Sequence, residues 1–128
     1  MNQQYVTFDD EGMIVSAGFG TPPEGAVIVD GTLSASDLLG LYVDGGNGLV
    51  PRPKVTAPNI VDDILTIPAG PNGTLLRLFD QISGEIMWQT TTDDTEIEHV
   101  LTLPDHGTYA VEVEPPFPWV SMQVEFVK

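Results

Sequence analysis

Residues 103–114, with the sequence LPDHGTYAVEVE, contain the strand pattern that decides the fold class of this chain. After an initial turn the side chains alternate between two faces, with Tyr109, Val111 and Val113 on one and Ala110, Glu112 and Glu114 on the other. Successive side chains of a β-strand point to opposite sides of the sheet. The pattern therefore predicts a strand that buries one face in a hydrophobic core.

Similar short runs, rich in Val, Ile, Leu, Thr and aromatic residues, fill the second half of the chain, and 13 glycines and 11 prolines separate such runs along the whole sequence. We expect strands at 63–67, 74–80, 85–91, 96–101, 108–114 and 120–127. In the 85–91 strand, Ile86 and Trp88 are expected to share the core face. This density of short strands is typical of a small β-sandwich and predicts an all-β protein.

A second feature of this region is the segment Asp105-His106-Gly107-Thr108-Tyr109. It resembles the tyrosine corner of immunoglobulin-like sandwiches, in which a tyrosine after a turn hydrogen-bonds back to the backbone. We therefore expect residues 59–128 to form an immunoglobulin-like β-sandwich. The Tyr109 ring should lie in its core, with the hydroxyl bonded to nearby backbone.

The first fifty residues indicate a different organisation, a short β-hairpin anchor segment. Strands are expected at 4–8, 13–16 and 26–29, followed by a ribbon within GLYVDGGNGLVPRP, residues 40–53. A single short helix is expected over 34–39, with Ser34 or Ser36 as its N-cap and Gly40 as its stop. Isolated hairpins of this size are marginally stable in water. Residues 1–50 are therefore expected to lie against a partner.

Residues 51–58, PRPKVTAP, indicate a linker between these two parts. Three prolines hold this backbone extended and lack the N–H groups that a β-ladder needs. Half of the basic residues of the chain, Arg52 and Lys54, lie here. We place the boundary between the two parts at about Lys54.

The charge of the chain restricts its partners. Nineteen acidic and four basic residues give a net charge of −15, which phosphate backbones and anionic lipid would both repel. No apolar run approaches the roughly 18–20 residues that span a bilayer. We therefore expect no direct contact with nucleic acid and no association with membranes. Seven of the acidic residues precede Arg52, the first basic residue.

The cysteine content and the first residues of the chain indicate where it folds. The absence of cysteine excludes disulfides and thiolate ligands and fits a reducing cytoplasm. The opening MNQQYVTFDDEG has neither the basic nor the apolar region of a secretory signal. We therefore expect the chain to fold in a cytoplasm and to carry no export signal.

No residue set in the sequence predicts catalysis, a cofactor or a metal site. His99 and His106 are not spaced as metal ligands, and we interpret both as surface histidines. The acidic runs FDDEG, VDD and TTDDTEIE do not have the spacing of an EF-hand loop, so turn-forming and solvated carboxylates are the simpler interpretation. No serine is framed as a nucleophile. We expect a protein that is not an enzyme.

The loop PPFPWV, residues 115–120, is the most distinctive aromatic feature. Phe117 stands between Pro116 and Pro118, and Trp119 follows Pro118, so the prolines make this aromatic loop stiff. Three interpretations remain open: a plug over the end of the sandwich, a contact with another protein, or a platform for a sugar.

The order of these features resembles small virion structural proteins from the tail and fibre gene region of tailed bacteriophages. The resemblance covers nearly the whole chain and rests most on Tyr5–Phe8, Tyr42–Pro53 and Gly107–Phe126. It implies a multicopy structural protein of the virion that is assembled in the host cytoplasm. Its N-terminal ribbons would dock on a neighbouring tail or fibre subunit, and its immunoglobulin-like domain would be displayed. The tail, its baseplate or its fibres are the expected location, with a head decoration protein or a host-glycan-binding module as alternatives.

The residues expected to contact partners follow from this resemblance and from the aromatic loop. They are Tyr5, Phe8, Tyr42, Val43, Arg52, Phe117 and Trp119.

Overall fold

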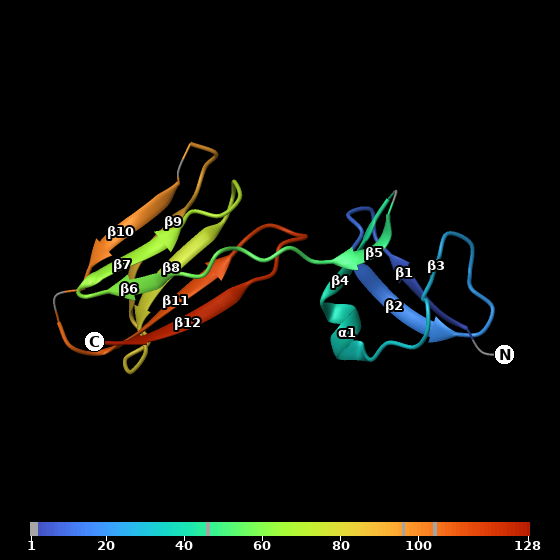
Figure 1. Cartoon of the computed structure of the whole chain (residues 1–128), viewed down its shortest axis with the longest axis horizontal. Coiled ribbons are helices and arrows are strands. Elements are labelled where there is room, and N and C mark those ends of the chain that lie inside the picture. The colour runs from blue at the N-terminus through green and yellow to red at the C-terminus, as the bar shows by residue number, and fades with distance from the viewer. Residues whose placement is uncertain (1–2, 46, 96, 104) are drawn as a thin grey trace. The chain divides into compact units, whose positions relative to one another are not determined.

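The computed structural model describes residues 3–45, 47–95, 97–103 and 105–128 (Figure 1). The chain divides into two compact units, one up to Pro53 and one from Lys54 to Lys128. Antiparallel strands dominate the described part of both units, as the sequence predicts, and the first unit also contains a short helix.

In the first unit, β1 pairs on its two sides with β2 and β3, and β4 pairs with β5 (Figure 1). The elements are β1 Gln4–Phe8, β2 Ile14–Phe19, β3 Val27–Ile28, α1 Ala35–Leu39, β4 Leu41–Asp44 and β5 Gly48–Pro51. The hairpin β1–β2 and the ribbon β4–β5 are where the sequence predicts them.

The helix α1 also forms where the sequence predicts it. Ser34 is the N-cap, because its hydroxyl accepts the backbone N–H of Asp37 while the Asp37 carboxylate accepts the N–H of Ser34. This reciprocal pair is a capping box, which satisfies two donors that the helix leaves unpaired. Gly40 is the C-cap. The helix turns Leu38 into the unit and leaves Leu39 exposed.

The first unit has a core of its own, although a small one. Its buried members are Val6, Val29, Leu38 and Val43. Gln4 is buried beside them at 4% exposure, and its side-chain amide forms two hydrogen bonds to the backbone of Leu33, at 2.7 and 3.0 Å. The amide thus fastens the segment before α1 to strand β1.

Gly12 connects the β1–β2 turn to the ribbon. Its carbonyl accepts the N–H of Val43 at 2.8 Å, and its φ of +92° lies in the region that favours glycine. A Cβ at this position would lie 2.1 Å from the Val43 carbonyl oxygen. Only glycine permits this approach of the two backbones.

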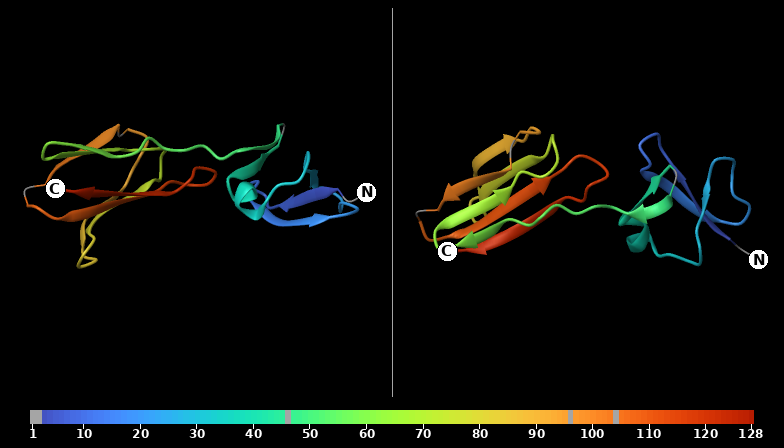
Figure 2. Two further views of the ribbon diagram at one scale, coloured as in Figure 1. Left: turned by 60° about the horizontal axis from the view of Figure 1, so that its bottom comes forward. Right: turned by 45° about the horizontal axis from the view of Figure 1, so that its top comes forward.

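In the second unit, the strands form two antiparallel sheets, with orders β10-β7-β6 and β12-β11-β8-β9. Figure 2 shows the two sheets of this unit as separate layers. The strands are β6 Asn59–Val61, β7 Ile64–Pro68, β8 Leu75–Asp80, β9 Ile86–Thr91, β10 Glu98–Thr102, β11 Thr108–Glu114 and β12 Met122–Val127.

Both sheets contribute to one hydrophobic core. Leu65 and Ile67 of β7 are fully buried, as are Leu76 of β8 and Val111 of β11. The alternation in β11 follows the prediction, because Tyr109, Val111 and Val113 are buried while Glu112 and Glu114 are partly exposed. Ala110 lies on the other face and is nevertheless buried.

Tyr109 forms the predicted hydrogen bond. Its ring is 4% exposed, and its hydroxyl donates to the carbonyl oxygen of Asp105 at 2.8 Å. The bond closes the turn before β11, so the ring and the turn hold each other in place.

The prediction that Ile86 shares the core face of its strand with Trp88 is wrong. Trp88 lies opposite Leu78 and packs on the core, but Ile86 lies opposite Phe79 and is exposed. The register shifts at this point, which makes Met87 the extra residue of a β-bulge. The bulge reverses the face on which Ile86 would otherwise lie.

Residues 51–58, expected to form a linker, are built into the two units. Pro51 pairs with Leu41 as the last residue of β5. Lys54 forms a parallel bridge with Val120, and Val55 is buried in the core of the second unit.

Candidate functional site: interaction surfaces of the two units

The partner-contact residues predicted in the first unit occupy different environments. Phe8 is partly exposed at 38%, whereas Val43 is 7% exposed and belongs to the small core. Tyr5 and Tyr42 are half-buried. The half-buried Arg52 donates from its guanidinium to the carbonyl of Leu39 at 3.4 Å. These residues do not form a single surface patch, because they lie on both the core and the outer sides of their strands.

The Tyr5 ring lies over its cross-strand partner Gly18. A Cβ at Gly18 would come within 2.7 Å of the Tyr5 hydroxyl oxygen. The missing side chain of Gly18 therefore gives the ring its place on the outer face of the β1–β2 hairpin, where it covers backbone.

The most exposed of the large apolar side chains in this hairpin lie on or beside β2. Val15 is 61% exposed and Phe19 57%, and Met13, just before the strand, is 43% exposed. None of these three residues is among the partner contacts predicted from the sequence. The signal that was available is the composition of Ile14–Phe19, IVSAGF, a strand without charge or proline.

In the second unit, the aromatic loop is folded onto the protein. Trp119 packs against the core cluster, and its backbone N–H donates to the carbonyl of Pro116 at 3.0 Å. Phe117 is half-buried and precedes Pro118 through a cis peptide bond. The contact made by Trp119 is of the kind expected for a plug over one end of the core of this unit.

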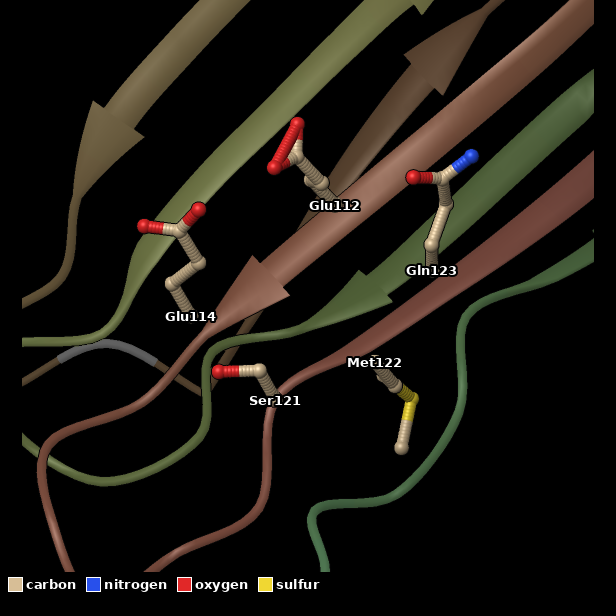
Figure 3. A pocket seen from close by; sticks show the side chains of 5 residues that line it. All are labelled: Glu112, Glu114, Ser121, Met122 and Gln123. Carbon is tan, nitrogen blue, oxygen red and sulfur yellow. The ribbon is translucent and has the colours of Figure 1, made fainter.

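A hollow of about 280 Å³ lies over β11 and the start of β12 and is lined by Glu112, Glu114, Ser121, Met122 and Gln123 (Figure 3). Glu112 and Gln123 are cross-strand partners, so their side chains stand on one side of the sheet, while Met122 points to the other. Arg77 forms ion pairs with Glu112 at 3.6 Å and Glu114 at 3.3 Å.

These ion pairs define the chemistry of the hollow. One guanidinium faces two carboxylates, so the group retains a net negative charge, and the three side chains are between 30% and 42% exposed. In such solvated positions ion pairs contribute little to stability. The hollow offers neither a framed nucleophile nor a buried acid–base pair.

Several aspartates form turns, as the sequence analysis favoured. The Asp9 carboxylate accepts the N–H groups of Glu11 and Met13, and the Asp80 carboxylate accepts those of Ile82 and Ser83. Asp93 accepts both the N–H and the hydroxyl of Thr95. Short acidic side chains are favoured at such turns because they bond to backbone a few residues ahead.

His99 is not the surface histidine expected from the sequence. It is half-buried on the core side of β10, with its ring centroid 5.2 Å from that of Trp88 and the planes tilted by 59°. Its position opposite Ile67 places it there. His106 is exposed.

The described residues also bear on metal binding and on membrane crossing. Outside residues 1–2, 46, 96 and 104, histidines and acidic residues do not gather in groups of three or more that could hold a metal ion. Across the same residues, no helix has the length and apolar character needed to cross a bilayer.

Comparison of the chain with models of protein families, with curated proteins and with solved structures gave no match.

Proposed function

We propose that this chain is a non-enzymatic structural protein of a tailed bacteriophage virion, at the tail, its baseplate or its fibres. It docks on a neighbouring virion protein through the first unit and displays the second. The observation that carries the docking role is the exposed apolar surface of β2 beside a core of only four buried residues. The place in a virion comes from the resemblance of the sequence to small tail and fibre proteins.

The second unit is, in this proposal, an immunoglobulin-like sandwich. Support comes from the sheet β8-β11-β12, which follows the order of strands C, F and G in that fold, and from β6-β7-β10, which follows A, B and E. The bond from Tyr109 to Asp105, at the start of the strand equivalent to F, supports it as well. A rigid displayed domain of this kind suits a spacer or contact module on a particle.

The experiment is incorporation into particles. Variants of the chain are produced in host cells during phage multiplication, and the amount that co-sediments with purified virions is measured. We expect deletion of residues 1–53 to abolish incorporation, while circular dichroism shows that residues 54–128 remain folded. A full-length chain with Ile82→Ser, a change at a side chain 86% exposed in the second unit, should incorporate normally.

Two outcomes would contradict the proposal. Incorporation of the truncated chain at the full-length level would place the docking surface in the second unit. Failure of the full-length chain to co-sediment would remove the virion role. A glycan array probed with residues 54–128 tests the host-glycan alternative, which predicts binding that Phe117→Ala reduces.

A further inference from the structure

The strand β2 lies at the edge of its sheet, and the hydrogen-bond pattern shows which of its backbone groups face outward. Gly20 donates to the carbonyl of Gln3 at 2.9 Å, so Gln3 and Gly20 form a hydrogen-bonded pair. Pairs alternate along an antiparallel ladder, so Tyr5 with Gly18 is the next such pair. The N–H and C=O groups of Ala17 and Phe19 therefore point away from β1.

These outward groups lack partners within the described chain. In the sheet order β2-β1-β3, β2 has a strand on one side only. Within residues 3–45, 47–95, 97–103 and 105–128, no group outside the hairpin forms a hydrogen bond with Ala17 or Phe19. An edge of this kind is a template for the addition of another strand.

Two side chains on this edge face the core side of the sheet but are not covered by it. Ala17 lies opposite Val6 and Phe19 opposite Gln4, and both of these β1 residues are buried. Ala17 and Phe19 thus face the core side of the sheet, yet Phe19 is 57% exposed. An added strand would cover the Phe19 ring and extend the four-residue core.

The corresponding edge of the second unit is different. Thr92 donates to the carbonyl of Thr74, which by the same alternation directs the backbone groups of Gln89 and Thr91 outward from β9. Their side chains are polar and suit contact with water. At these positions β9 presents polar side chains, whereas β2 presents Ala17 and Phe19. The exposed apolar residues of β9, Ile86 and Met87, lie at its bulge, where the ladder is irregular.

The charge of the first unit indicates the chemistry of the occupant. Seven acidic residues and one basic residue, Arg52, give residues 1–53 a net charge of 1 − 7 = −6. Asp10 and Glu11 are exposed in the turn directly before β2. A second copy of the chain would bring the same surplus and be repelled, whereas a segment with cationic residues would be attracted.

We propose that β2 accepts an extended segment of a partner protein as an additional antiparallel strand. The segment has alternating apolar residues that face the Phe19 side, and Lys or Arg just beyond its C-terminal end, where an antiparallel strand reaches Asp10 and Glu11. This inference rests on the proposed docking role of the first unit and names its contact element.

The test uses the full-length chain and a short synthetic peptide of alternating threonine and valine that ends in two lysines. We expect the shifted amide resonances to concentrate on β2 and the exchange of the Ala17 and Phe19 amide protons to slow by at least about tenfold. A peptide that ends in two glutamates should bind at least about tenfold more weakly. Added salt should weaken the binding of the peptide that ends in lysines.

The matched variants are proline substitutions at two edges. Ala17→Pro removes an outward N–H without a native partner and should raise the peptide Kd at least about tenfold. Gln123→Pro is the control, because Gly107 and Lys128 form a hydrogen-bonded pair and the alternation directs the Gln123 N–H outward from β12. If Ala17→Pro loses the dispersed amides of the first unit, Ala17→Glu, which keeps the backbone N–H, replaces it and should also weaken binding.

Three results would overturn the inference. These are peptide binding that shifts other residues, equal binding by the folded Ala17 variant, and a dimer of the chain in sedimentation that Ala17→Pro abolishes. The virion experiment separates this inference from the docking role. If deletion of residues 1–53 abolishes incorporation while the folded Ala17→Pro chain incorporates normally, docking stands and the β2 edge is not its contact.

Discussion

The side-chain amide of Gln4 acts in the first unit as a substitute for a backbone partner. Its oxygen accepts the N–H of Leu33 and its nitrogen donates to the Leu33 carbonyl, as a neighbouring strand would. A buried amide with both of these bonds satisfies the irregular segment before α1.

Replacement of Gln4 by leucine is expected to lower the stability of the first unit by about 2 kcal/mol, because it leaves the Leu33 groups unpaired in a partly buried position. The measurement is urea unfolding followed by amide resonances of the first unit. The control is Gln3→Leu at the exposed neighbouring position. Equal effects of the two substitutions would contradict the role of the amide.

Tyr109 gives a second prediction at the residue scale. Tyr109→Phe removes only the hydroxyl that donates to Asp105, so the ring should keep its packing and the second unit should lose about 1 kcal/mol. Differential scanning calorimetry of the full chain measures the loss. An unchanged transition would show that the bond contributes nothing to the turn.

At the scale of the elements, the β1–β2 turn is joined to the ribbon by the Gly12–Val43 contact. Gly12→Ala would introduce a Cβ at 2.1 Å from the Val43 carbonyl oxygen at a φ of +92°. Gly20→Ala is a matched control, since its φ is +111° and no atom lies within 4 Å of the added Cβ.

We expect Gly12→Ala to destabilise the first unit by at least about 2 kcal/mol, and Gly20→Ala by less, because the latter has backbone strain without a clash. Thermal melting of both variants measures the difference. If the two are equally destabilised, the close approach of the backbones is not a constraint.

At the scale of the elements, the sequence predicts the positions of strands and helix well but misses an irregularity within a strand. Strand positions follow from alternation and turn residues, and α1 follows from Ser34 and Gly40, because these signals are local. The bulge at Met87 inserts one residue into a period of two, which an alternating pattern by itself does not show. It therefore led to the wrong face for Ile86.

The choice of residues for the interaction surface depends on pairing that a local pattern does not show. Tyr42 and Val43 were both named, although neighbours on a strand face opposite sides, and Val43 proved to be core. Which strand lies at a sheet edge depends on pairing between distant segments. The sequence alone did not separate β2 from the other strands of the first unit.

At the scale of the whole molecule, the two units differ in the cores that support them. Ten buried residues form the core of the second unit and four that of the first. Since stability grows with the apolar area removed from water, the first unit should unfold at the lower temperature.

We therefore expect two transitions in the calorimetry of the full chain and one cooperative transition for residues 54–128 alone. The matched sample is residues 1–53 alone, which should melt below the isolated second unit. A single shared transition in the full chain, at the temperature of neither isolated unit, would show that the units are not thermodynamically separate.

The exposed edge of β2 also bears on the colloidal behaviour of the protein. Ile14–Phe19 has the composition of segments that stack into cross-β fibrils, being apolar and free of charge and proline. The net charge of −15 keeps copies apart at neutral pH, and this repulsion disappears as the carboxylates take up protons toward the isoelectric point of about 4.1. Light scattering should therefore rise steeply as the pH approaches that value, and more slowly for Ala17→Pro. The acidic surface thus opposes self-association through the exposed β2 edge.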